Sequence, residues 1–88
     1  MTFRVVWSKQ ATNELARWWA TSTDRAFVHQ AKQTVIQILG NDATKQGMEL
    51  SEGLRFVDIL PLRFYFNVDL ELAVAEVESV ARFRDQSL

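Results

Sequence analysis

The 88-residue sequence contains no cysteine and only one histidine. The absence of cysteine excludes disulfide bonds, thiolate zinc sites and a cysteine nucleophile, and the single His29 leaves no histidine pair for a metal ion. We therefore expect neither a metal site nor a cofactor. The sequence also has no apolar run near the ~18 residues that a membrane-spanning helix needs. Its N-terminal segment, MTFRVVW, lacks the apolar stretch of a secretion signal. We expect a cytoplasmic protein that does not bind membranes.

The chain has no excess of positive charge. Ten basic and eleven acidic residues give a net charge of −1. A protein with this balance has no global field that attracts nucleic acid, so any such binding must be local. The 48% share of hydrophobic residues is typical of a packed globule, and the sequence shows no linker or internal repeat. We expect one domain over residues 1–88.

Hydrophobic periodicity predicts the order of the elements. Alternation from Phe3 to Trp7 predicts a strand, and Ser8 is a suitable N-cap for a helix over residues 9–22. A second helix has a predicted buried stripe from Phe27 to Leu39 and a stop at Gly40-Asn41. The polar segment 41–53 predicts a loop.

The C-terminal half alternates with a period of two residues. Strands are predicted at residues 55–60, 62–68 and 72–80, with Pro61 in the turn of a tight hairpin. The resulting order, βααβββ, predicts an α+β fold in which a two-helix hairpin packs on one face of a largely antiparallel four-stranded sheet.

Two helices can cover only one face of such a sheet, so the other face should be open. In the strand 62–68, alternation places Leu62, Phe64, Phe66 and Val68 under the helices. It places Arg63, Tyr65 and Asn67 on the open face, where an arginine avoids the cost of an unpaired buried charge. The alternative for Arg63 is a surface ion pair with Glu76 or Glu78 on the neighbouring strand. The side on which Arg55 lies remains open.

Several segments, taken in order, resemble the RelE/ParE toxin superfamily. They are VVWSKQATNELARWW near the N-terminus, Gly47-Met48-Glu49-Leu50, Leu54-Arg55-Phe56-Val57, Pro61-Leu62-Arg63-Phe64-Tyr65, and the terminal Val77 to Asp85. The resemblance covers nearly the whole chain, although Arg63-x-Tyr65 is one residue shorter than the family's more common Arg-x-x-Tyr spacing.

The resemblance implies the toxin of a type II toxin–antitoxin pair, the class that includes plasmid stabilisation proteins, held inactive by a cognate antitoxin. RelE-like and YoeB-like members cut messenger RNA on the ribosome, ParE-like members poison DNA gyrase, and some members have no known toxicity. All three alternatives stay open, as does assembly into a homodimer or a toxin–antitoxin hetero-oligomer.

A ribonuclease of this family would need a base, an acid and groups that stabilise developing negative charge. The resemblance assigns charge stabilisation to Arg55, Arg63 and either Arg82 or Arg84, since arginine forks grip phosphate oxygens in pairs. Candidates for the base and the acid are Glu49 and Tyr65. The tail RFRDQSL lacks the histidine and tyrosine that YoeB-like members carry there.

Local charge favours a protein target. Between residues 49 and 78 there are seven acidic and two basic residues, whereas binding of RNA depends on neutralising phosphates. We therefore expect a ParE-like, protein-directed toxin, in which Arg63 and Arg84 recognise a protein. Trp18 and Trp19 are further candidates for partner binding. One of two adjacent helical tryptophans should pack inward, and the other should either cap the helical hairpin or be exposed as an anchor for a partner.

Overall fold

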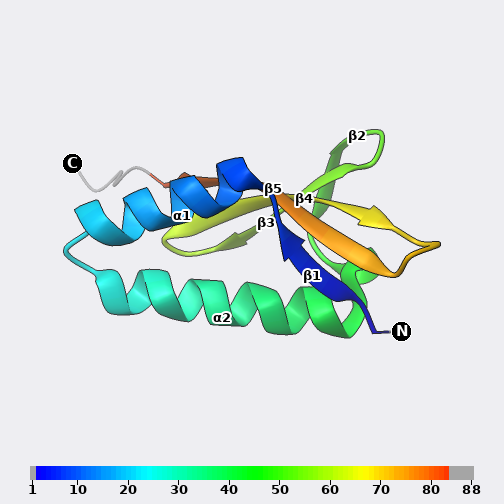
Figure 1. Cartoon of the computed structure of the whole chain (residues 1–88), viewed down its shortest axis with the longest axis horizontal. Coiled ribbons are helices and arrows are strands. Elements are labelled where there is room, and N and C mark those ends of the chain that lie inside the picture. The colour runs from blue at the N-terminus through cyan, green and yellow to red at the C-terminus, as the bar shows by residue number, and fades with distance from the viewer. Residues whose placement is uncertain (1, 84–88) are drawn as a thin grey trace.

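The computed structural model describes residues 2–83. Its elements are β1 (Arg4–Trp7), α1 (Lys9–Thr21), α2 (Arg25–Asp42), the 3₁₀ helix η1 (Ala43–Lys45), β2 (Met48–Ser51), β3 (Leu54–Ile59), β4 (Leu62–Asp69) and β5 (Val74–Arg82). The strands form one mixed sheet in the order β1-β5-β4-β3-β2, in which β1 pairs parallel with β5 and the other neighbours pair antiparallel (Figure 1). Neither helix in residues 2–83 has the length and apolar character to cross a membrane.

The predicted helical hairpin on a largely antiparallel sheet is confirmed, with one strand more than expected. Residues 41–53 were predicted as a loop, but Met48–Ser51 pairs with β3 and forms the fifth strand. All four of its residues are exposed. Met48 and Leu50 do alternate with Glu49 and Ser51, but a run of only four residues inside a polar, glycine-containing segment is too short for its period to separate a strand from a loop.

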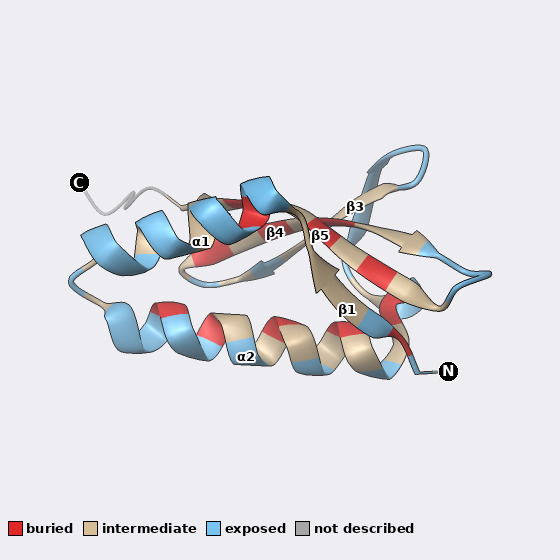
Figure 2. Ribbon diagram, in the orientation of Figure 1, coloured by how far each residue is buried: buried red, intermediate tan, exposed pale blue. Residues whose placement is uncertain are grey.

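The core lies between the helices and one face of the sheet, as Figure 2 shows by the buried bands on α2, β4 and β5. In β4 the burial alternates as predicted, since Leu62, Phe64 and Phe66 are fully buried. Full burial of one such side chain contributes about 1.5–3 kcal/mol. The prediction for Phe27 was wrong: this side chain is 61% exposed at the start of α2, and the buried stripe of the helix consists of Val28, Ala31, Val35 and Leu39.

Helix α1 covers the part of the β5 edge that lies beyond the short strand β1. β1 pairs with β5 only as far as Val77. Beyond it, the Ser8 hydroxyl donates to the carbonyl of Glu78 (2.7 Å), and the amide of Val80 donates to the Glu14 carboxylate (2.7 Å). Ser8 also accepts from the amide of Ala11, which confirms it as the N-cap of α1. Side chains of one helix thus satisfy backbone groups of an otherwise open strand edge.

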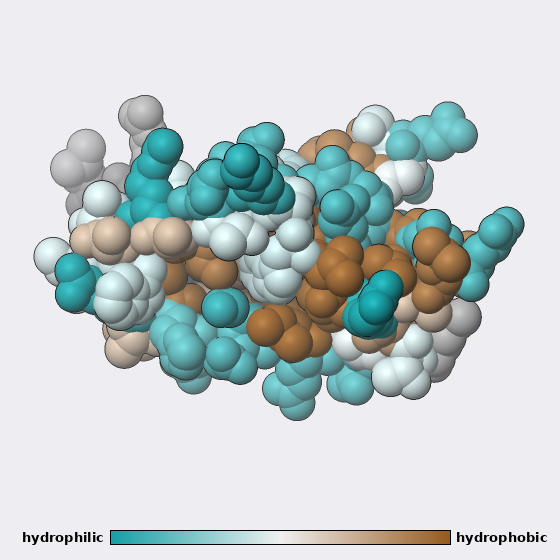
Figure 3. Space-filling view, viewed as in Figure 1, coloured by the Kyte–Doolittle hydropathy of each residue, from teal (hydrophilic) through white to brown (hydrophobic). Residues whose placement is uncertain are grey.

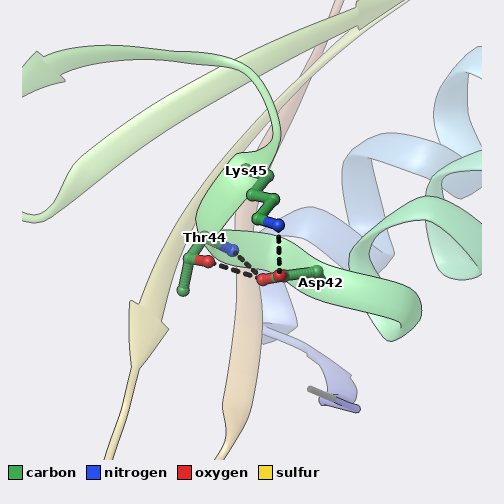
Figure 4. Close-up of polar contacts among 3 residues, drawn as sticks. All are labelled: Asp42, Thr44 and Lys45. Atoms are coloured by element: carbon green, nitrogen blue, oxygen red, sulfur yellow. Dashed lines mark hydrogen bonds and ion pairs between the residues drawn. The ribbon is translucent and has the colours of Figure 1, made fainter.

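The chain passes from α2 to β2 through a compact capped turn. The Asp42 carboxylate accepts from the amide and the hydroxyl of Thr44 and lies 4.0 Å from Nζ of Lys45 (Figure 4). These hydrogen bonds from Thr44 lower the pKa of Asp42. Gly47 follows with a φ of +72°, and a Cβ there would lie 2.1 Å from the carbonyl oxygen of Phe56. The turn therefore requires glycine at this position.

Candidate functional site

The face of the sheet away from the helices is open, as predicted. Asp58 lies directly opposite Arg63, and Phe56 lies directly opposite Tyr65, in the β3–β4 register. Directly opposed residues in antiparallel strands point to the same side. The same face carries two further acids on β5: Glu76 lies opposite Asn67, and Glu78 contacts Asn67. The Glu78 carboxylate accepts a hydrogen bond from the Asn67 amide.

Arg63 forms a two-point ion pair on this face. Its Nε donates to Oδ1 of Asp58 at 2.6 Å, and its Nη2 donates to Oδ2 at 3.0 Å. The guanidinium carbon lies 4.1 Å from the ring centre of Phe56 and 5.1 Å from that of Phe83. The hydrogen bonds to Asp58 raise the pKa of Arg63 further above its ordinary value. Arg63 thus forms a surface ion pair, but the predicted partners Glu76 and Glu78 on β5 were wrong. The partner is Asp58 on β3, the neighbouring strand on the opposite side of β4.

Arg55 lies on the helix-covered side, which answers the question that the sequence left open. It is directly opposite the buried Phe66. Its Nε donates to the carbonyl of Gln46 at 2.9 Å, and its Nη2 approaches the carbonyl of Gly47 at 3.4 Å. This arginine therefore fixes the loop before β2. Glu49 lies opposite Arg55 on the exposed edge strand.

Arg82 also points to the helix side, where it joins β5 to the turn between α1 and α2. Its Nη1 donates to the hydroxyl of Ser22 and its Nη2 to the carboxylate of Asp24, both at 3.1 Å. The hydrogen bond from Arg82 is the main cause that lowers the pKa of Asp24. Asp24 occupies the N-cap position of α2, but its carboxylate contacts Arg82 and makes no capping hydrogen bond. Arg84 lies outside the described residues.

Within residues 2–83 the candidate catalytic residues form two separate pairs. Arg63 and Tyr65 alternate on the open face of β4, and Arg55 and Glu49 lie opposite each other in β3 and β2. The half-buried ring of Tyr65 lies 6.3 Å from that of Phe56. Tyr65 also lines a small hollow of about 250 Å³ with Gln10, Leu54, Glu78 and Ser79. The other described candidates do not join Arg63 and Tyr65 on the open face: these are Arg55 and Arg82 on the helix side and Glu49 on the edge strand. The catalytic roles of all these residues remain predictions.

The two adjacent tryptophans have different environments, as expected. Trp18 is half-buried, and its indole N–H donates to the carbonyl of Val80 at 2.8 Å. Trp19 is 47% exposed, and the guanidinium of Arg25 lies 4.8 Å above its ring. Trp19 borders a groove of about 350 Å³ between the helices, whose other lining residues are Thr12, Leu15, Ala16, Val28, His29 and Lys32. Of the two tryptophans, Trp19 is therefore the one available to a partner.

Comparison with solved structures gives strong matches in fold. The toxin–antitoxin complex RelBE2 of Mycobacterium tuberculosis contains a chain that superposes with a TM-score of 0.80 at 14% identity, over 97% of this chain and 95% of that chain. The isolated RelE toxin of E. coli gives 0.68 at 15% identity, over 97% and 88%. A chain of the ParDE system of P. aeruginosa gives 0.65 at 15% identity, over 94% and 98%.

The chain has the fold of the RelE and ParE toxins. The resemblance inferred from its sequence is thereby confirmed at the level of the fold. No protein-family profile matches the sequence, and no curated protein matches it in sequence. The similarity extends to RelE and to ParE proteins alike, so it does not separate the two subtypes.

One end of the sheet carries an acidic hollow. A depression of about 770 Å³ lies between the β2–β3 turn and the β4–β5 turn, lined by Glu52, Gly53, Leu54, Asn67, Val68, Asp69, Leu70, Glu71 and Glu78. Four of these residues are acidic and none is basic.

On the helix side, polar residues dominate the surface of the helices and apolar residues gather over β1 and the adjacent end of the sheet (Figure 3).

Asp58, which faces Arg63 in the site, was not among the residues predicted from the sequence. The signal was present, because a two-residue turn at Leu60-Pro61 places residues 58 and 63 opposite each other. Asp24 was not predicted as a partner of Arg82 for a different reason, since 58 residues separate them and only the packed fold brings them together. Residues 2–83 contain no cluster of three or more histidine, cysteine, aspartate or glutamate residues that could hold a metal ion.

Proposed function

We propose that this protein is the toxin of a cytoplasmic type II toxin–antitoxin system and that its target is a protein, in the manner of a ParE-like gyrase poison. The ion pair between Arg63 and Asp58 carries the second part of the proposal. It neutralises the arginine that the central strand presents on the open face, and Glu76 and Glu78 lie on the same face. RNA phosphates would find little positive charge there.

A cognate antitoxin is the proposed partner. Several of the solved structures with this fold are toxin–antitoxin complexes. On this chain, the proposed contact surface is the helical hairpin at Trp19 and Phe27, which are 47% and 61% exposed. Aromatic side chains of this size often supply most of the binding energy at an interface. Arg84 is retained as a partner-binding candidate from the sequence, and the free protein is proposed to be monomeric or dimeric before it joins the hetero-oligomer.

The direct test uses the purified protein with purified DNA gyrase. Inhibition of supercoiling, relieved by the product of a neighbouring antitoxin gene, is the expected result. Unchanged supercoiling at a large molar excess of the protein would contradict a gyrase target.

The second candidate is a ribosome-dependent endoribonuclease, which the placement of Arg63 and Tyr65 on one face favours. Translating ribosomes would be incubated with the wild type and with Arg63→Ala. Cuts in the ribosomal A site that disappear in the variant would support this candidate. A protein that leaves growth unaffected when produced without any antitoxin would be the non-toxic relative that only binds its partner.

A further inference from the structure

Arg63 is placed to bind an anion, but the carboxylate of Asp58 in the same chain already contacts its guanidinium. Its guanidinium is held near the rings of Phe56 and Phe83, at 4.1 and 5.1 Å. Its side chain is 31% exposed, so solvent reaches it. An arginine fork that is positioned by aromatic rings and reachable from solvent binds carboxylate or phosphate oxygens in pairs. The backbone register fixes this position in the middle of the sheet.

Asp58 occupies the Nε–Nη2 edge of that fork. Its two carboxylate oxygens lie 2.6 and 3.0 Å from these nitrogens, which is the geometry that two phosphate oxygens would adopt. The contact joins directly opposed residues of adjacent strands, so it does not depend on a flexible loop. A phosphate that uses this edge must displace the carboxylate, and one that approaches the remaining Nη1–Nη2 edge meets a neutralised ion pair in place of a lone cation.

We propose that Asp58 determines the specificity of the open face by excluding nucleic-acid phosphates from Arg63. The inference deepens the proposed function, since it names the residue that directs the protein away from RNA. It concerns binding by the isolated protein, so it can fail while the chain still arrests growth, and it can hold while gyrase proves not to be the target.

The experiment measures binding of a fluorescent single-stranded RNA oligonucleotide by anisotropy across a range of potassium chloride concentrations. Asp58→Ala is compared with Glu71→Ala, which removes the same charge from the exposed β4–β5 turn. At low salt we expect Asp58→Ala to bind about three- to tenfold more tightly than Glu71→Ala. The slope of log K against log salt should be steeper by about 0.7, as one added phosphate contact requires on a single strand.

The double variant Asp58→Ala/Arg63→Ala should lose the whole gain, because the gain depends on the released guanidinium. Equal binding by Asp58→Ala and Glu71→Ala would overturn the proposal, as would a gain that persists in the double variant. Circular dichroism checks that each variant is folded. If Asp58→Ala does not fold, Asp58→Asn keeps the side-chain shape, and it must show a gain over Glu71→Gln for the proposal to stand.

Discussion

Trp18 and Trp19 are neighbours in the sequence, but they serve different purposes in the structure. The indole of Trp18 packs against the core and donates to the carbonyl of Val80, while Trp19 is about half exposed and has the Arg25 guanidinium over its ring. An amphipathic helix turns by about 100° per residue, so two adjacent large side chains cannot both face the sheet. The sequence predicts this division, but it does not predict the bond to Val80, because that partner lies 62 residues away.

We expect Trp18→Phe to lower the free energy of unfolding by about 1–3 kcal/mol, since phenylalanine leaves the carbonyl of Val80 without its donor. Trp19→Phe is the matched control and should change it by no more than about 0.5 kcal/mol. Urea unfolding of both variants measures the difference. Equal effects would show that the two indoles are equivalent in the folded protein.

The Asp24–Arg82 contact should make stability depend on pH. The hydrogen bond from Arg82 lowers the pKa of Asp24 in the folded state, so the carboxylate is harder to protonate there than in the unfolded chain. The contribution of this contact to the free energy of unfolding is then fully present above the usual aspartate pKa, about 3.9. It is lost as the pH falls from there through the lower pKa that Asp24 has in the folded protein.

Asp24→Asn should accordingly be less stable than the wild type at pH 6, and this difference should shrink as the pH falls below about 4. Urea unfolding over this range checks it. The same substitution in an Arg82→Ala background should show a much weaker pH dependence, because the coupled partner is gone. A difference that stays constant with pH would disprove the linkage.

At the scale of elements, hydrophobic period predicts both helices and four of the strands. It fails where tertiary contacts decide, as in β2, whose four exposed residues pair with β3 without burying a face. It also misses the irregular pairing of β4 and β5 near Tyr65 and Phe66, because an extra residue in one strand leaves the sequence alternation locally ambiguous. For the candidate site, alternation predicts the open-face position of Arg63, but the sides of Arg55 and Arg82 emerge only from the register.

Two glycines flank β2, and they should respond differently to alanine. Gly47 has φ +72°, and an added Cβ would collide with the backbone of Phe56, whereas Gly53 has φ +82° and open space around it. We expect Gly53→Ala to cost about 1–2 kcal/mol, the penalty of the left-handed conformation alone. Gly47→Ala should cost clearly more, because the collision with Phe56 adds to it. Denaturant unfolding compares them, and similar losses would contradict the close approach of β2 to β3.

At the scale of the whole molecule, this chain combines the fold of the RelE and ParE toxins with an open face and a hollow that carry little net positive charge. The open face pairs its central arginine with an aspartate, and the hollow between the turns is lined by four acids and no base. A fold does not fix the target of a protein, which depends on the groups placed upon it. The distribution of charge is therefore the basis on which we propose a protein target and not a ribosomal RNA surface.

The central claim is tested most directly by measuring which synthesis stops first in cells that produce the protein without an antitoxin. Labelled thymidine and labelled methionine would be followed together in the minutes after induction. A protein-directed poison of gyrase should stop thymidine incorporation while methionine incorporation continues. If methionine incorporation collapses first and thymidine incorporation follows, the protein acts on translation, and the proposed gyrase target is wrong.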